Sequence, residues 1–345
     1  MQNRNRKPFN PKTISRREFL AMATGAAGAA LTLAATRSFA QPNPAFPTKP
    51  IRLIVGFSAG GGADAFARLV GTYLEAKLGQ PIVIENRAGA NGKIANDYVA
   101  SQAPDGYTLL LSTSSATVVA PYAWPDMKVH PVRDLAPITL ACESEFVLIT
   151  NPSLEAKTFA EFVALAKKKP GEIVHGSPGL GSANHVAGEL LQLRTGISMN
   201  TVHYKGSAPI MTELLANRVN LTIASAGLAQ PYIESKRVGV LMAMSKERLP
   251  TLPNVPSSVE LGVKDLDQIK FWLSLHAPKG TPSPVIDRIR GALVDVYKVD
   301  ALKAKMAEQG LKPVASTPSE FAARMESELK LYGDIFKKAN IKVEG

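Results

Sequence analysis

The chain of 345 residues carries 40 Lys and Arg against 29 Asp and Glu, a formal net charge of +11 at pH 7. Much of this excess lies in residues 1–40, which hold seven basic residues and one acidic residue, so the remainder carries +5. Basic and aromatic residues do not alternate, which argues against nucleic-acid binding. A single cysteine, Cys142, excludes an intrachain disulfide, and the five histidines lack the close spacing of a zinc motif.

Residues 1–40 resemble an export signal of the twin-arginine type. Basic residues lead into Ser15–Leu20, which contains Arg16 and Arg17, and an uncharged run follows. The stretch Ser38–Ala40 has the small-x-small pattern of a cleavage site. The run is rich in Gly, Ala and Thr, which favours a removable signal over a membrane anchor. We therefore expect cleavage after Ala40 and a periplasmic location.

Beyond this segment, apolar runs of strand length alternate with helical periodicities. Strands are predicted at 51–57, 82–85, 108–112, 146–150, 172–176, 199–203, 221–225, 238–244 and, as an extended segment, 271–276. Helices are predicted from Asp64 to about Leu78, around 94–101, at 159–168, 184–194 and 208–217, and over most of 284–338. This rhythm predicts an α/β fold with mainly parallel sheets, and about 300 residues are enough for two domains.

The first predicted strand ends in the segment Phe57–Asp64, which contains Gly60, Gly61 and Gly62 before a helix begins. A helix N-terminus leaves backbone N–H groups unpaired, and these groups attract an anion. A second loop of this kind, 176–185, follows a later strand. Each loop alone reads as a tight turn before a capped helix. Two loops in parallel contexts favour a binding cleft between two α/β halves.

The letters Gly56-Phe57-Ser58-Ala59-Gly60 also fit the nucleophile elbow of a serine hydrolase. That elbow needs several strands before it, to build the sheet and the oxyanion loop. Only about ten residues separate Ala40 from the first strand here. No dinucleotide or Walker fingerprint is complete elsewhere in the chain. We therefore predict a protein without a cofactor, and a hydrolase using Ser58 is the disfavoured alternative.

From Phe57 onwards, a series of short motifs resembles the Bug-type periplasmic solute-binding proteins of tripartite tricarboxylate transporters. Each motif is weak alone, but their order is specific, and together they span nearly all of the chain after residue 40. They are 57–64, 78–81, 85–92, 104–109, 169–171, 176–182, 203–206, 252–256 and 277–282.

The resemblance implies a periplasmic binding protein fold of type II, with two α/β domains joined by a hinge and a ligand cleft between them. Domain 1 would comprise residues 45–147 and 272–345, and domain 2 residues 148–271. The chain would cross between them near 146–150 and 271–276.

The resemblance also implies roles for individual residues. Phe57 and Ala59 would wall the pocket, Gly60, Gly61 and Gly62 would let the backbone approach the ligand, and Ser182, Ala183 and Asn184 would grip its far end. Asp64 either caps its helix or selects ligand charge, His185 either contacts the ligand or packs its helix, and Lys205 either pairs with a carboxylate or is solvated. The further predicted site residues are Ser58, Ala63, Ser112, Ser114, Gly181 and Ser225.

The function that the resemblance implies is capture of a small organic acid with one or two carboxylates, aliphatic or aromatic. Clamp closure would bury the acid, and the protein would then deliver it to membrane permease subunits. Ala63 stands where many relatives carry Thr or Ser, so the identity of the acid stays open. The alternative within this class is a sensor that presents its ligand to a signalling partner. We expect a monomer that binds no nucleic acid and no metal.

Overall fold

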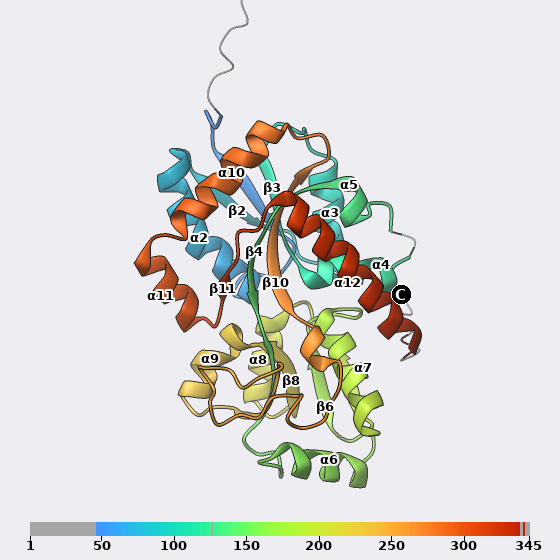
Figure 1. Cartoon of the computed structure of the whole chain (residues 1–345). Helices are drawn as coiled ribbons and strands as arrows, with labels where there is room; N and C mark the ends of the chain where they lie inside the picture. Colours follow the sequence, from blue (N-terminus) through green and yellow to red (C-terminus); the bar gives the residue numbers. More distant parts are fainter. Residues whose placement is uncertain (1–45, 126, 339–340, 342–345) are drawn as a thin grey trace, which may run out of the picture. The chain divides into compact units, whose positions relative to one another are not determined.

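The computed structural model of the protein describes residues 46–125, 127–338 and 341 (Figure 1). The predicted twin-arginine signal and its cleavage site after Ala40 lie outside the described residues. Within the described part, no helix has both the length and the apolar character that a membrane crossing requires. Two β-sheets, each with its own helices, organise this part of the chain.

The first sheet has six strands in the order β11-β4-β10-β3-β1-β2. β1 pairs in parallel with β2 and β3, whereas β10 runs antiparallel to β3 and β4, and β11 runs antiparallel to β4. The strand bounds are β1 Ile51–Val55, β2 Ile82–Asn86, β3 Thr108–Thr113, β4 Leu135–Ser144, β10 Phe271–Pro278 and β11 Lys312–Pro313.

The second sheet has five strands in the order β7-β6-β8-β5-β9. β6 pairs in parallel with β7 and β8, and β5 runs antiparallel to β8 and β9. The strand bounds are β5 Phe146–Thr150, β6 Val174–Ser177, β7 Asn200–His203, β8 Leu221–Ser225 and β9 Gly239–Met244.

Both sheets are mixed, so the prediction of mainly parallel sheets is wrong. The strands that join the sheets cause the difference. β4 ends at Ser144 and β5 begins at Phe146, so the chain passes from one sheet to the other through Glu145 alone. No helix reverses the chain there, and β4 and β5 each run against their neighbours. The sequence analysis also missed β4 as a strand.

The helices largely follow the predicted periodicities. α2 begins at Gly62 rather than Asp64, and α9 was not predicted. α2 and α10 pack against each other beside the first sheet (Figure 1). The α-helix bounds are α2 Gly62–Leu78, α3 Lys93–Ala100, α4 Ala120–Ala123, α5 Pro131–Asp134, α6 Phe159–Lys168, α7 Ala183–Thr195, α8 Ser207–Leu215, α9 Ala226–Glu234, α10 Ser283–Val296, α11 Asp300–Glu308 and α12 Pro318–Lys338; the short helices are η1 Ala90–Gly92, η2 Ser115–Val119 and η3 Leu266–Gln268.

Where the chain passes between the sheets, partly buried charges hold β4, β10 and α12 together. The Arg324 guanidinium donates to Glu143 at 2.7 Å and to Glu328 at 2.8 Å, and the Trp272 indole N–H donates to Glu328 at 2.8 Å. Lys270 also forms an ion pair with Glu145, the single residue that connects β4 to β5. The chain passes between the sheets at Glu145 and again just before Phe271, close to the crossings that the sequence analysis expects. The domain bounds given there stay a prediction.

Candidate functional site

The loop between β1 and α2 is held in shape by a buried carboxylate. Asp64 is 3% exposed. Its Oδ2 accepts from the Gly60 N–H and from Arg68 Nε, each at 3.0 Å, and its Oδ1 accepts from Asn86 Nδ2 at 3.0 Å. Burial opposes ionisation, but these hydrogen bonds outweigh it, and the pKa of the Asp64 carboxyl lies below its usual value.

Asp64 is therefore not the N-cap of α2. The N-cap is Gly61, which has no side chain to cap with, and Asp64 lies in the first helical turn. From there its carboxylate reaches back to the N–H of Gly60, whose φ of +81° favours glycine. The negative charge also suits the positive end of the helix. The carboxylate thus positions the glycine loop.

The loop between β6 and α7 is anchored by Ser182, which caps the helix, and by His185 in its first turn. Ser182 Oγ accepts from the His185 backbone N–H at 3.1 Å, which makes Ser182 the N-cap of α7. The His185 Nδ1 accepts from the Gly181 N–H at 3.1 Å, so the ring proton is assigned to Nε2, which faces Glu189 Oε1 at 3.5 Å. His185, which is 6% exposed, also stacks edge-on against His203. Both side chains therefore shape the loop.

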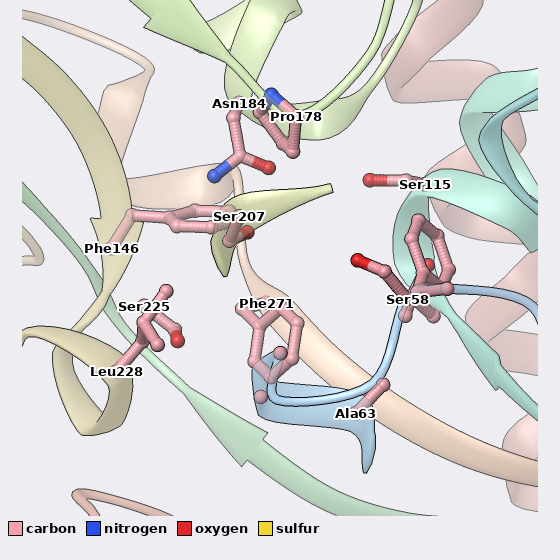
Figure 2. A pocket seen from close by; sticks show the side chains of 14 residues that line it. Ser58, Ala63, Ser115, Phe146, Pro178, Asn184, Ser207, Ser225, Leu228 and Phe271 are labelled. Atoms are coloured by element: carbon pink, nitrogen blue, oxygen red, sulfur yellow. The ribbon is translucent and has the colours of Figure 1, made fainter. Parts of the chain in front are cut away.

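A cavity lies between the two loops, and we call it the ligand cavity (Figure 2). Its volume is about 40 Å³, and none of its fourteen lining residues carries an ionisable side chain. Hydroxyls and one amide supply the polar groups, and three phenylalanine rings supply most of the apolar wall. The lining residues are Phe57, Ser58, Gly61, Gly62, Ala63, Thr113, Ser115, Phe146, Pro178, Asn184, Ser207, Ser225, Leu228 and Phe271.

Four helices direct their N-termini at this cavity. Residues at the beginnings of α2, α7, α8 and α9 all line it. Within the described part of the chain, the N–H groups of Gly62 and Ala63 donate to no backbone or capping acceptor. Unpaired amides at helix N-termini carry partial positive charge and attract anions. The cavity can therefore hold an anion without a cationic side chain.

Hydrogen bonds join the two halves of the chain around the cavity. Ser58 Oγ donates to the Lys205 carbonyl at 3.1 Å, and the Ala183 N–H donates to Ser115 Oγ at 2.9 Å. Asn91 Nδ2 donates to the Gly181 carbonyl at 3.1 Å. Each bond links a segment that follows a strand of the first sheet to a segment that follows a strand of the second, so the cleft is closed in this structure.

The structure brings seven of the predicted site residues together in the cavity wall. They are Phe57, Ser58, Gly61, Gly62, Ala63, Asn184 and Ser225. The other predicted residues lie around the cavity and do not line it, and they are Ala59, Gly60, Asp64, Ser112, Ser114, Gly181, Ser182, Ala183, His185 and Lys205.

Several of these outer residues have partners that explain their position. Ser112 Oγ bonds to Thr117 Oγ1 at 2.9 Å inside the first domain. Lys205 borders a different cavity, beside His203. No described histidine lines the ligand cavity, and the Ser58 hydroxyl donates to a backbone carbonyl. Ser58 therefore lacks the base that a nucleophile elbow requires.

Sequence reasoning missed part of the wall. Ser115 follows the predicted strand end by three residues and lies in η2, and Ser207 begins α8 after β7. The rule that ligands bind beyond strand C-termini points to both. Phe146 and Phe271 are different, because they begin the strands at the two crossings and reach the cavity only through tertiary folding. The remaining missed residues are Pro178 and Leu228. Thr113 also lines the cavity, and its place at a strand end beside Ser112 and Ser114 marks it in the sequence as a hydroxyl donor.

Two α/β domains with a closed, uncharged cavity between them define a periplasmic binding protein fold of type II. Solved structures agree with this. The Rhodopseudomonas palustris protein Rpa4515, described with adipate, is similar with a TM-score of 0.83 and 30% identity, covering 86% of this chain and 99% of that one. MatC from the same organism, described with bound malate, is similar with a TM-score of 0.80 and 27% identity, covering 84% and 99%.

Sequence comparisons narrow the class to a family. The sequence model described as "Tripartite tricarboxylate transporter family receptor" matches residues 66–341. Protein BugT of Bordetella pertussis is 34% identical over 313 residues, which cover 90% of this chain and 96% of BugT. The chain belongs to the tripartite tricarboxylate transporter receptor family. It is a periplasmic solute-binding protein and not an enzyme.

Proposed function

We propose that this protein captures a small organic carboxylate, aliphatic or aromatic, by closure of its two domains. The observation that carries the proposal is the uncharged cavity faced by four helix N-termini. A carboxylate would accept from the free amides of Gly62 and Ala63 and from nearby hydroxyls. The phenylalanine rings would contact the carbon skeleton of the acid. The adipate and malate named for two structural relatives support this class of ligand.

Calorimetry with a matched pair of ligands tests the proposal. Adipate and its uncharged analogue adipamide have the same length, and so do benzoate and benzamide. We expect the acids to bind and the amides to bind at least tenfold more weakly, because only the carboxylate engages the positive ends of the helices. Equal affinity for acid and amide would contradict a carboxylate site.

A substitution in the first loop gives an independent check. Gly61→Val places two methyl groups at the cavity wall while leaving φ at an allowed value of −80°. We expect loss of acid binding with an unchanged circular dichroism spectrum. Undiminished binding would exclude the first loop from the site.

We further propose that the loaded protein delivers its acid to the permease of a tripartite tricarboxylate-type transporter, and that it acts as a monomer. Uptake of a labelled acid should fall when the gene is deleted. It should return with the wild-type gene and not with the Gly61→Val variant. Uptake that is unchanged when the gene is deleted would show that the protein does not deliver the acid to the transporter.

Export is also part of the proposal. We infer that residues 1–40 direct twin-arginine export and are removed after Ala40. The doubly substituted chain R16K/R17K should remain inside the cell at its full length, while the parent chain should be recovered from the periplasm with Gln41 as its first residue. A different first residue would show that the signal is cleaved elsewhere than after Ala40.

A further inference from the structure

The ligand cavity is much smaller than the two cavities beside it. Its volume is about 40 Å³, against about 220 and 230 Å³ for those two. The free amides of Gly62 and Ala63 make it the site for the carboxylate group of an acid. The domains are already in contact around it through Ser58, Ser115 and Asn91. If the protein binds an organic acid, as proposed above, the rest of that acid has to extend beyond this cavity.

A second cavity adjoins the first, and we call it the annex. Its volume is about 230 Å³. Five residues border both cavities, and the side chains of Leu228 and Phe271 are the bulky ones among them, so these two form the partition (Figure 2 shows both from the ligand cavity). The residues lining the annex are Gly60, Gly61, Gly62, Ala65, Ser225, Gly227, Leu228, Pro231, Tyr232, Phe271, Gln309 and Leu311.

Like the ligand cavity, the annex has no carboxylate, ammonium, guanidinium or imidazole group in its wall, and it is larger. Its bulky apolar side chains are Leu228, Pro231, Phe271 and Leu311. These side chains stabilise uncharged hydrocarbon, and the annex offers no cationic side chain to a second carboxylate.

The annex is also formed by domain closure. Ala65 lies on α2 and Leu311 beside β11, whereas Pro231 lies on α9 of the other domain. Gly227 of α9 approaches the Gln309 carbonyl so closely that a Cβ atom at position 227 would overlap it. A group held in the annex would therefore contact both domains, as the carboxylate does in the ligand cavity.

A third cavity, of about 220 Å³, is the alternative site for the rest of the ligand. It shares only Phe57 and Pro178 with the ligand cavity, and Lys205 and His203 border it. This cavity suits a second carboxylate. The annex, with five shared residues, has the broader boundary with the ligand cavity.

We propose that the preferred ligand is a monocarboxylic acid with an uncharged apolar tail, whose carboxylate lies in the ligand cavity and whose tail lies in the annex. Leu228 and Phe271 contact the tail where it passes between the two. The size of the annex then determines which length of acid tail binds best. The proposal rests on the proposed function and adds the substrate class.

Calorimetry with straight-chain monocarboxylates from acetate to octanoate tests it, alongside dicarboxylates of equal length. We expect affinity to rise up to about fourfold for each methylene, the factor that corresponds to burial of one methylene, until the annex is full. Dicarboxylates should not show this gain, because their second charge would enter an apolar cavity.

A variant and its matched control locate the tail. Ala65 is exposed on α2 and faces the annex, so Ala65→Leu fills the annex without disturbing the core or the helix. It should weaken octanoate binding about tenfold and leave acetate binding unchanged. Ala76→Leu, at another exposed alanine of the same helix away from all three cavities, should change neither.

Two results would overturn the proposal while leaving the proposed function intact. One is binding of acids with no gain for longer monocarboxylates. The other is a gain for dicarboxylates alone that Lys205→Met removes, which would place the tail in the third cavity. Failure of every acid to bind would instead overturn both the substrate class and the proposed function.

Discussion

Gly181 lies where the two domains meet, and replacing it tests whether the closed cleft is the binding state. Its φ of +65° favours glycine, and a Cβ atom there would overlap the Cβ of Ala123 in α4. Gly196, at the other end of α7, has a φ of +66° and open space around it. Gly181→Ala and Gly196→Ala therefore share the backbone strain, about 1–2 kcal/mol. Only the first adds a clash between domains.

The size of the effect follows from the contacts that the clash would break. Two carbon atoms in contact lie about 3.5–4.0 Å apart, so the domains would have to separate by about 1 Å or more. That movement breaks the bond from the Ala183 N–H to Ser115 Oγ and the bond from Asn91 to the Gly181 carbonyl. At about 1 kcal/mol each, the loss is about 2 kcal/mol, or roughly a 30-fold weaker affinity.

The assay is calorimetric titration of both variants with the best-binding acid, together with thermal melting. Both should melt below the wild type, since they share the strain, and Gly181→Ala should melt lower still because it also loses the two bonds between the domains. Only Gly181→Ala should lose about 30-fold in affinity. Equal affinity in the two variants would show that binding does not require the approach of the β6–α7 loop to α4, and the reasoning from the closed cleft would fail.

Three further predictions concern stability and the shape of the loop. Burial lowers the pKa of His175 and of His276 to about 3, so both side chains take up protons when the protein unfolds below pH 6.5. The stability that the two neutral histidines contribute is therefore full above pH 6.5 and is lost as the pH falls toward 3. Urea titrations should give a free energy of unfolding about 4 kcal/mol lower at pH 5 than at pH 7, and a flat profile would contradict this. Asp64→Asn should lower stability by about 1–3 kcal/mol and weaken acid binding, because the glycine loop loses its charged anchor, and unchanged melting and calorimetry would show that the loop holds itself. Arg324→Met should cost about 1–3 kcal/mol in urea unfolding because two partly buried carboxylates, Glu143 and Glu328, lose their guanidinium partner. Arg133→Met, at an exposed pair, should leave the unfolding curve near the wild type, and similar curves for the two variants would refute the role of the network.

Local patterns were enough to predict most elements. The run Ile51–Val55 is a strand because β-branched side chains suit a buried sheet, and Thr158 with Glu161 begins α6 through a capping box. The direction of a strand has no such local signature. β5 and β10 look like any other apolar strand, yet both run against their neighbours because they carry the chain between sheets. The prediction of parallel sheets failed at these strands.

The candidate site likewise contains some features that local patterns predict and others that only the fold determines. Glycine loops before helices are visible in sequence, because a short segment is enough to expose free amides. They led to Gly61, Gly62 and Asn184, which line the cavity. The sequence left the role of His185 open, and the structure assigns its Nδ1 to the Gly181 N–H. That bond depends on how a loop folds back onto its own helix.

What the sequence by itself determined is the kind of protein: an α/β chain with two amide-rich loops and the motifs of one receptor family. Those features are local, so composition and spacing carry them. Only the tertiary structure decided that Phe146 and Phe271 wall the cavity, that Asp64 faces away from it, and that an apolar annex continues it. The physical reason is that a cavity is made by segments distant in sequence, such as α2, α9 and β10, which meet only when two domains close.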